Sequence, residues 1–373
     1  MADDIGTVRA SCLCGNIRYN IDLPRADYPL RAGFCHCNSC RHVSGTLCMT
    51  MVFPPKRFQP SAHLLNQMHS FQFSERCTQY SCTTCGSKML ERQGSHDLVD
   101  SQVTWGIMSG TLEKADGVFE VKYHCWIEDT LDGGFSDFFQ PTKGDHPERW
   151  LRGEGQSEKS PLFWQSPTFL NAQPPPQDRL HAHCKCGGVS FYIARPSTQS
   201  ALGKAPWPDV LIPFHSMAPK PQDGAWWLAA GGTKFLAGVC SCDSCRLACG
   251  VEWVEWAFVP VSDITLDADG RTSFSREFGK LKRYESSPGV RRYFCGGCAA
   301  TIFWDGDERP DVIDVGVGLL DAAEGARAES WLQWRSQRIS FREDAIPRAE
   351  SLILAAENGM KQYGHKYQGI PFK

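Results

Sequence analysis

Cys35-His36-Cys37-Asn38-Ser39-Cys40-Arg41 is a stretch that returns further along the chain as Cys240-Ser241-Cys242-Asp243-Ser244-Cys245-Arg246. Each copy reads CxCxxC followed by arginine. Three thiols at this spacing can converge on one ion, because alternate residues and a tight turn bring their sulfur atoms together. Zn²⁺ takes four ligands, and three protein ligands with one open position are typical of catalytic zinc. The stretch therefore predicts a metal site in each copy, either structural or functional.

A second set of cysteines surrounds each copy. A CxC pair comes before it and a CxxC pair after it, so the order CxC, CxCxxC, CxxC occurs twice. The pairs are Cys12 with Cys14 and Cys82 with Cys85, then Cys184 with Cys186 and Cys295 with Cys298. The flanking residues place these pairs at strand ends, as in a zinc ribbon. An ion held there replaces part of the burial that small sheets lack.

The chain has eighteen cysteines, and their clustering favours metal over disulfides. Partners two residues apart bridge poorly, because a disulfide restricts the Cα separation and the Cβ directions. Four cysteines lie outside the repeat and are predicted to be buried free thiols: Cys48, Cys77, Cys125 and Cys249. Cys249, which closely follows Cys245, is the alternative source of a fourth thiolate.

The bulk composition is that of an ordinary soluble protein. The 373 residues suggest two or three domains, and the 42% of hydrophobic residues is enough for ordinary cores. A formal charge of −3 gives no electrostatic reason to expect a nucleic acid or an anionic membrane as partner. No apolar run approaches membrane-spanning length, and residues 1–10 lack the apolar region of a signal peptide. We therefore expect a cytoplasmic protein; its oligomeric state is left open.

Strand-like segments dominate the chain, so the expected class is mainly antiparallel β with a short C-terminal helix. We expect a first zinc-binding domain at 1–140, a surface linker at 141–180 that contains Pro174-Pro175-Pro176, and a second domain at 181–373 with an insertion at 196–232. Expected strands in the first domain include 16–22, 49–53, 98–107 and 118–127. Pro347 suits the first turn of the C-terminal helix and Gly359 suits its end.

The residues around the cysteines resemble the glutathione-dependent formaldehyde-activating enzyme family, to which centromere protein V also belongs. The first copy carries Ser11-Cys12-Leu13-Cys14-Gly15 and Tyr80-Ser81-Cys82-Thr83-Thr84-Cys85-Gly86-Ser87 around its CxCxxC stretch. The second carries His183-Cys184-Lys185-Cys186-Gly187 and Tyr293-Phe294-Cys295-Gly296-Gly297-Cys298. The likeness covers most of 11–140 and 181–345, and the tandem copies with the stretch 124–134 are most similar to fungal members. Ala299 departs from the glycine that usually follows CxxC.

The resemblance implies two zinc-stapled, tent-like β domains with two zinc ions in each. It assigns one structural zinc to Cys12, Cys14, Cys82 and Cys85, and its counterpart to Cys184, Cys186, Cys295 and Cys298. It assigns a third zinc ion to Cys35, Cys37 and Cys40, and a fourth to Cys240, Cys242 and Cys245. It also implies that glutathione, or its adduct with a small aldehyde, approaches these second ions in a carbon–sulfur lyase reaction. The insertion at 196–232 could cover the open site of the second copy.

Zinc chemistry fits a thiol substrate, because an open Zn²⁺ lowers the pKa of a bound thiol and holds it as thiolate. Three thiolates already place a charge of −3 on a +2 ion, which weakens it as a Lewis acid and favours thiol exchange over water activation. Arg41 and Arg246 adjoin the sites and could bind a glutathione carboxylate, or could cap the turn. His36 could move protons, but Ser241 replaces it in the second copy.

Two further hypotheses stay open. The chain could be a non-catalytic tandem zinc scaffold, in which another residue closes each three-cysteine site. Trp226, Trp227, Trp253 and Trp256 could then line an interaction pocket, or could be core. Alternatively, the two copies could differ, with one catalytic and the other supporting it. The longer insertion and the fuller downstream pattern favour the second copy as the active one.

Overall fold

The computed structural model describes residues 4–55, 58–95, 97–98, 102–142, 144–168, 177–219 and 224–371. The prolines at 174–176 of the expected linker lie outside these residues. We call 4–168 the first half and 177–371 the second half. Both are built mainly from antiparallel sheets, and one helix lies near the C-terminus, so the predicted mainly β class is confirmed; the helix is longer than the short one predicted.

The first half contains a hairpin and an eight-stranded sheet. The hairpin pairs β1 (Ile5–Ser11) with β2 (Arg18–Pro24). The sheet has the order β10-β9-β3-β4-β8-β7-β6-β5. Its strands are β3 (Leu30–Cys35), β4 (Met49–Phe53), β5 (Met68–Gln72), β6 (Cys77–Cys82), β7 (Lys88–Gln93), β8 (Thr104–Met108), β9 (Phe119–Cys125) and β10 (Glu148–Arg149). A short helix, α2 (Ala62–Asn66), precedes β5.

The second half repeats this plan. β11 (Arg179–His183) and β12 (Ser190–Ala194) form the hairpin, which extends to β16 (Ile264–Thr265). The main sheet runs β13-β14-β15-β20-β19-β18-β17, and β21 also pairs with β14. These strands are β13 (Leu228–Ala229), β14 (Lys234–Cys240), β15 (Val254–Pro260), β17 (Leu281–Ser287), β18 (Val290–Cys295), β19 (Thr301–Gly306), β20 (Val312–Gly316) and β21 (Leu332–Trp334).

The repeat therefore extends from the cysteines to the strand order. β3-β4-β8-β7-β6-β5 matches β14-β15-β20-β19-β18-β17 position by position. The parallel partner of β3 is β9, and that of β14 is β21. Each hairpin is tied to its own half by one equivalent bridge, Ala10 to Leu112 and Ala182 to Leu320.

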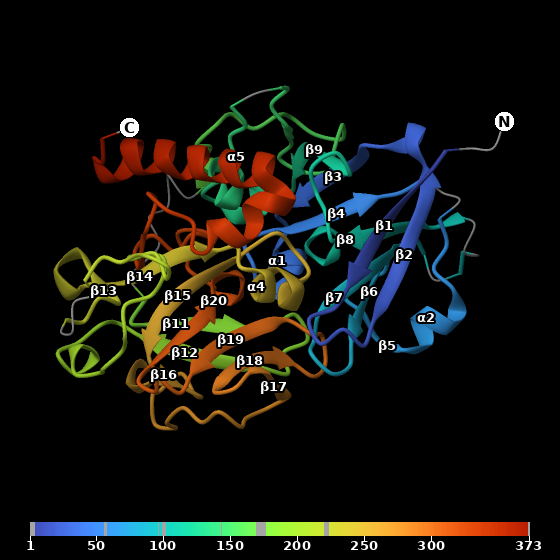
Figure 1. Ribbon diagram of the computed structural model, residues 1–373. Coiled ribbons are helices and arrows are strands. Elements are labelled where there is room, and N and C mark those ends of the chain that lie inside the picture. The colour runs from blue at the N-terminus through green and yellow to red at the C-terminus, as the bar shows by residue number, and fades with distance from the viewer. Residues whose placement is uncertain are drawn as a thin grey trace.

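The halves meet through two short helices that begin within the CxCxxC stretches. α1 (Asn38–Ser44) packs on the 3-10 turn η9 (Val317–Leu319) of the second half. α4 (Asp243–Cys249) packs on the equivalent turn η3 (Ser109–Thr111) of the first half. Both helices lie at the centre of the molecule, between the blue and orange sheets (Figure 1). The interface is thus reciprocal, as in a two-fold dimer.

Glycines make this close approach possible. α1 ends at Gly45 and α4 at Gly250, both with positive φ, at 82° and 78°. The Gly318 N–H donates to the Gly45 oxygen at 3.1 Å, and the Gly110 N–H donates to the Gly250 oxygen at 3.0 Å. A Cβ added to any of these four glycines would collide with backbone of the other half.

The C-terminal helix differs from the prediction at both of its expected markers. α5 spans Arg342–Gln368 and has a kink at Ala349, so Pro347 lies beyond the first turn. Gly359 does not end the helix, which continues to Gln368 and is capped by Gly369. A side chain at Gly359 would collide with the backbone of Phe138, so this glycine serves close packing rather than termination.

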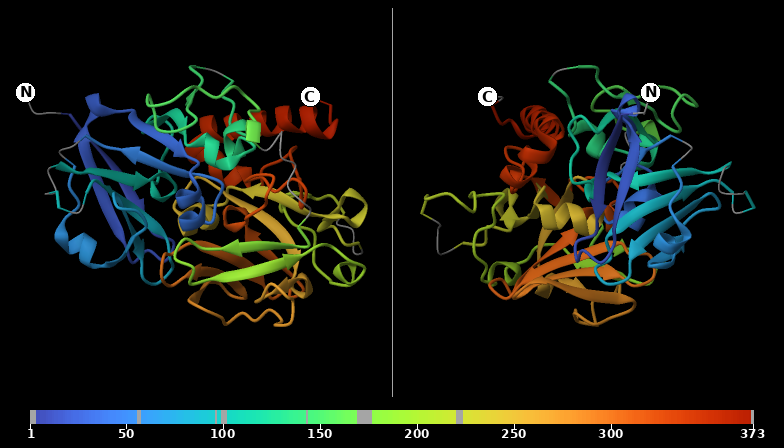
Figure 2. Two further views of the ribbon diagram at one scale, coloured as in Figure 1. Left: turned by 180° about the vertical axis from the view of Figure 1, so that it is seen from behind. Right: turned by 45° about the vertical axis from the view of Figure 1, so that its right-hand side comes forward.

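α5 belongs to the second half in sequence but packs on the first. Gln140 donates from its backbone to Ala355, and Asp116 accepts from the backbone of Glu350 at 2.7 Å. Figure 2 shows α5 on the same side of the molecule as the green segment that follows β9. Part of the expected linker also packs on the first half, because β10 pairs in parallel with β9. The domain boundaries stay a prediction.

The core includes Trp226 and Trp227 of the insertion, Trp253 just before β15 and Trp256 within it, whereas Phe214 of the insertion is 60% exposed. Trp227 and Trp253 are each 1% exposed, and Trp226 and Trp256 are also buried. The Trp227 indole donates to the Ser200 oxygen and the Trp226 indole to the Ala205 oxygen. None of the helices among the described residues is long and apolar enough to cross a membrane.

Ala299 occupies a left-handed backbone position, with φ of 57°, where the first half has Gly86 at 73°. A left-handed conformation costs a residue with a Cβ about 1–2 kcal/mol. We expect Ala299→Gly to raise the free energy of unfolding by about 1 kcal/mol, measured by denaturant titration. Ala300→Gly is the matched control and should lower that free energy. A lower stability for Ala299→Gly would contradict this account.

Candidate metal centres

Each half brings its CxC and CxxC pairs into one cluster. Cys12 follows β1, Cys82 ends β6, and Cys85 lies in the turn before β7. Neighbouring sulfurs are 3.4 Å apart for Cys12 and Cys14, and 3.6 Å apart for Cys14 and Cys82. All four ligand atoms lie within 4.8 Å of one another. The sequence predicted that these pairs lie at strand ends, and they do so in the structure.

The second cluster has the same build. Cys184 follows β11, Cys295 ends β18, and Cys298 precedes β19. The sulfur of Cys186 is 3.7 Å from that of Cys184 and 3.5 Å from that of Cys295. These separations exclude disulfides, whose sulfurs bond at about 2.0 Å. They fit tetrahedral zinc, whose sulfurs at about 2.3 Å from the ion lie about 3.8 Å apart.

The three-cysteine sets form two further clusters, each with all sulfurs within 4.8 Å of one another. We call Cys35, Cys37 and Cys40 the first trio, and Cys240, Cys242 and Cys245 the second trio. In each, the first cysteine ends a strand, the middle one caps a helix, and the last lies in its first turn. The capping sulfur accepts from the backbone N–H of the last cysteine, at 3.3 Å and 3.4 Å. This local structure explains the spacing CxCxxC.

The surroundings of the first trio are acidic. Cys125 ends β9 opposite Cys35, and a hydrogen bond between the two thiols raises the pKa of Cys35. Glu91 is buried beside Cys77, and burial raises the pKa of Glu91 to about 7. The Gln93 amide donates to Glu91 at 2.8 Å, while the other carboxylate oxygen has no hydrogen-bond partner among the residues that the structure describes. The pattern alone indicated only a packed thiol at Cys125.

The second trio has a cation at its edge instead. Arg292 is 7% exposed, and its Nη1 donates to the Cys245 sulfur at 3.4 Å. Hydrogen bonds from the Cys240 and Cys242 thiols, together with Arg292, hold the pKa of Cys245 well below its usual range. Asp314 is paired with Arg309, and burial raises the pKa of Asp314 to about 7. Ser340 lies beside Cys240 where Cys125 lies beside Cys35.

Arg41 and Arg246 follow the trios but point across the interface. The Arg41 Nη1 donates to the backbone oxygens of Gly318 and Leu320 in the second half. The Arg246 Nη1 donates to the equivalent oxygens of Gly110 and Leu112 in the first half. Both arginines are buried. These contacts indicate an interface role, and the expected glutathione carboxylate contact stays a prediction.

His36 belongs to a buried pair of histidines. Its ring is fully buried, and its Nε2 lies 2.9 Å from the Nδ1 of His124, on neighbouring strand ends. Burial lowers the pKa of His36 to about 3. The imidazole is therefore neutral at physiological pH, and the proton-shuttle hypothesis is not supported.

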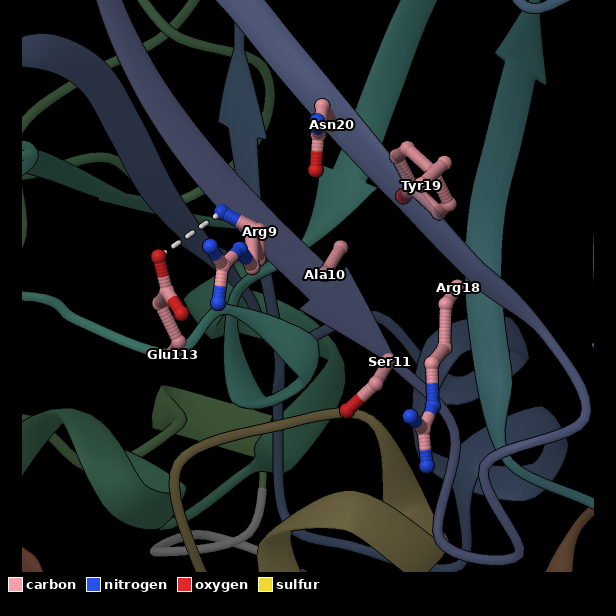
Figure 3. Close-up of a pocket in the computed structure, with 7 residues that line it drawn as sticks. All are labelled: Arg9, Ala10, Ser11, Arg18, Tyr19, Asn20 and Glu113. Atoms are coloured by element: carbon pink, nitrogen blue, oxygen red, sulfur yellow. Dashed lines mark hydrogen bonds between the residues drawn. The ribbon is translucent and has the colours of Figure 1, made fainter.

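Two surface pockets of about 410 Å³ lie on the β1–β2 hairpin and are not lined by any cysteine of a trio. Both include Arg18, Tyr19 and Asn20. Figure 3 shows the first of them, where the Arg9 backbone N–H donates to Glu113 at 3.2 Å. Neither pocket is lined by a cysteine, so the thiol clusters remain the candidate site.

A duplicated β fold with one four-thiol and one three-thiol cluster in each copy defines a class of cysteine-rich protein whose clusters could hold metal ions. The model of the glutathione-dependent formaldehyde-activating enzyme family matches residues 7–129 and 228–336. These segments cover more than half of the chain, which belongs to this family. No curated protein matches the chain at a significant level.

Three features of the structure could not be predicted from the sequence. Arg292 is one of two adjacent arginines before Tyr293, and only the strand pairing shows which of them faces Cys245. The contact between Cys125 and Cys35 depends on a parallel pairing of distant strands. The cluster of His42, His183 and Asp321 joins the two halves, so no local spacing signals it.

Proposed function

We propose that the chain catalyses formation and cleavage of the carbon–sulfur bond between glutathione and formaldehyde or a related small aldehyde. In the forward direction the thiol sulfur bonds to the carbonyl carbon, and the thiol proton passes to the carbonyl oxygen. The product is S-hydroxymethylglutathione. Membership of the family supports the reaction class, and the thiol clusters support its dependence on a metal.

The residues fit zinc, because both four-thiol clusters have the spacing of tetrahedral thiolate ligands. Cys12, Cys14, Cys82 and Cys85, and their four counterparts, would hold structural ions. The two trios would each hold one more. Zinc bound to a trio would supply acidification of a fourth, incoming thiol. The chain itself holds the ligands in place through the strand end and the first helical turn.

We propose the second trio as the reactive one, and the contact between Arg292 and Cys245 carries this proposal. A fourth thiolate brings the ligand charge to −4 against +2 on the ion. The buried guanidinium offsets part of that excess at 3.4 Å from a ligand sulfur. Among the described residues no arginine or lysine donates to a sulfur of the first trio, and Glu91 and the Cys125 thiol lie nearby. An incoming anion is therefore better tolerated at the second trio.

The test is a direct assay of the zinc-loaded, full-length protein with glutathione and formaldehyde. S-hydroxymethylglutathione should form faster than in the uncatalysed mixture, with a rate proportional to protein concentration. Zinc content and X-ray absorption at the zinc edge, measured with and without glutathione, provide a readout besides turnover. A zinc shell unchanged by glutathione, with no rate enhancement, would favour the alternative of a tandem zinc scaffold.

Arg292→Met should lower kcat/KM for glutathione by about 10- to 100-fold, because a hydrogen bond to a charged group contributes about 1.5–3 kcal/mol. The zinc content should not change. Arg292→Lys should recover part of the loss, because it restores the charge without the planar fork. The matched control is Arg283→Met, at an exposed position of the neighbouring strand β17. Equal losses in both variants would rule out a specific role for Arg292.

A further inference from the structure

Three side chains from both halves converge at the interface, outside every cysteine cluster. His42 lies in α1 of the first half, His183 ends β11, and Asp321 follows η9. The His42 Nε2 is 3.2 Å from one carboxylate oxygen of Asp321, and the His183 Nε2 is 2.8 Å from the other. The three ligand atoms all lie within 4.8 Å of one another.

The hydrogen bonds on the far side of each ring fix its tautomer. The Nδ1 of His42 lies 2.8 Å from the backbone oxygen of His183. The Nδ1 of His183 lies 3.1 Å from the backbone oxygen of Cys184. A carbonyl oxygen only accepts, so each Nδ1 must carry the hydrogen. In the neutral imidazoles, both Nε2 atoms then present lone pairs to the carboxylate.

Lone pairs on two nitrogens and a carboxylate repel one another at these distances unless a cation lies among them. The two rings are stacked with centroids 4.2 Å apart, and the Arg41 guanidinium donates to the Leu320 backbone oxygen next to Asp321. One divalent ion satisfies both nitrogens and the carboxylate at once.

We propose that His42, His183 and Asp321 form an interfacial site for a divalent transition-metal ion, with Zn²⁺ as the preferred occupant. Imidazole nitrogen and carboxylate oxygen bind zinc at about 2.0–2.2 Å, which places tetrahedral ligands about 3.3 Å apart. A ligand histidine almost always donates its other ring N–H to a carbonyl or carboxylate, as both histidines do here. The site is separate from the proposed catalytic function and would fasten one half to the other.

Two neighbouring features define how the site would work. The imidazole rings are stacked with an interplanar angle of 7°, so a shared ion requires one ring to tilt. His183 has room to do so, because its side chain is 30% exposed while that of His42 is 7% exposed. His181 lies 3.4 Å from Asp321 through Nδ1, and its Nε2 contacts the Ser190 hydroxyl, which can accept. His181 can therefore donate to the carboxylate through Nδ1 and orient it.

Cobalt distinguishes this site from the thiol clusters. Full-length protein, dialysed against a weak chelator so that thiolate-held zinc remains, is titrated with Co²⁺. We expect one further ion per chain, with ligand-field absorption but without the sulfur-to-metal charge-transfer band of a thiolate site. Added Zn²⁺ should displace the Co²⁺ and raise the melting temperature of the wild-type protein, because the ion binds only the docked halves.

Asp321→Asn and His183→Ala should each weaken this uptake by at least about tenfold, since even partners of a metal ligand contribute 10- to 100-fold to affinity. His63→Ala, in α2, is the matched control and should bind Co²⁺ as the wild type does. Circular dichroism and the remaining zinc content identify any variant that fails to fold. The proposal is overturned if the wild type takes up no further ion, if uptake carries the charge-transfer band, or if folded Asp321→Asn and His183→Ala proteins bind unchanged.

Discussion

Cys245→Ser is expected to reduce S-hydroxymethylglutathione formation by at least about 100-fold while the chain stays folded. Loss of one of only three ligands removes the ion of the second trio, and residues that merely orient ligands already contribute 10- to 100-fold. The serine also removes the sulfur that Arg292 contacts. The measurements are the steady-state rate, the zinc content, which should fall by one ion per chain, and far-ultraviolet circular dichroism.

Cys40→Ser is the matched control, because Cys40 is the same position of the first trio. It should also lose one zinc ion but retain most of the turnover. If Cys40→Ser alone abolished turnover, the first trio would be the reactive one. If both variants kept full activity, the carbon–sulfur chemistry would not take place at the trios, and the scaffold alternative would gain support.

Asp137→Ala should lower the free energy of unfolding by about 3–5 kcal/mol, because Arg149 loses its counter-ion and Arg327 keeps only Glu329 and the more distant Asp132. Asp137 is fully buried between Arg327 of the second half, at 2.8 Å, and Arg149 of the first, at 2.7 Å. It also accepts from the Phe163 backbone N–H at 2.8 Å. Urea unfolding monitored by tryptophan fluorescence measures the loss.

The control for this variant is Asp307→Ala, because Asp307 pairs with Arg291 while its own side chain is 70% exposed. Solvent screens that pair, so its loss should cost less than about 1 kcal/mol. A similar small cost for Asp137→Ala would show that the buried network between the halves adds little to stability. A loss beyond the total stability would appear as an unfolded protein, and Asp137→Asn, which keeps the shape and part of the hydrogen bonding, then supplies a measurable value.

The cysteine spacing carried most of the predictive information because it reflects local geometry. CxCxxC encodes a strand end, a helix cap and a first turn, all within one short stretch. The strand at 49–53 was predicted with its observed bounds, since Pro54 limits it. The prediction that the helix ends at Gly359 was wrong, because the sequence does not distinguish a glycine that ends a helix from one that allows a neighbouring backbone to approach closely.

What escaped prediction depends on contacts between residues far apart in the chain. Arg41 follows Cys40, which the pattern assigns to a metal site, yet its guanidinium contacts the backbone of the other half. Arg292 faces Cys245 only because β18 lies over the second trio. His42 and Asp321 belong to different halves, and their meeting follows from the reciprocal interface rather than from any spacing.

The reciprocal glycine contacts have an evolutionary consequence. In a symmetric pair of identical chains, one substitution alters both copies of a contact, so neither surface can change alone. Joining the copies in one chain removes that constraint while the mutual packing of α1 and α4 is kept. Gln79 and Arg292 show the result, because they occupy matching positions on β6 and β18 and have become different residues. The covalent link thus allows one copy to specialise while the other preserves the shared architecture.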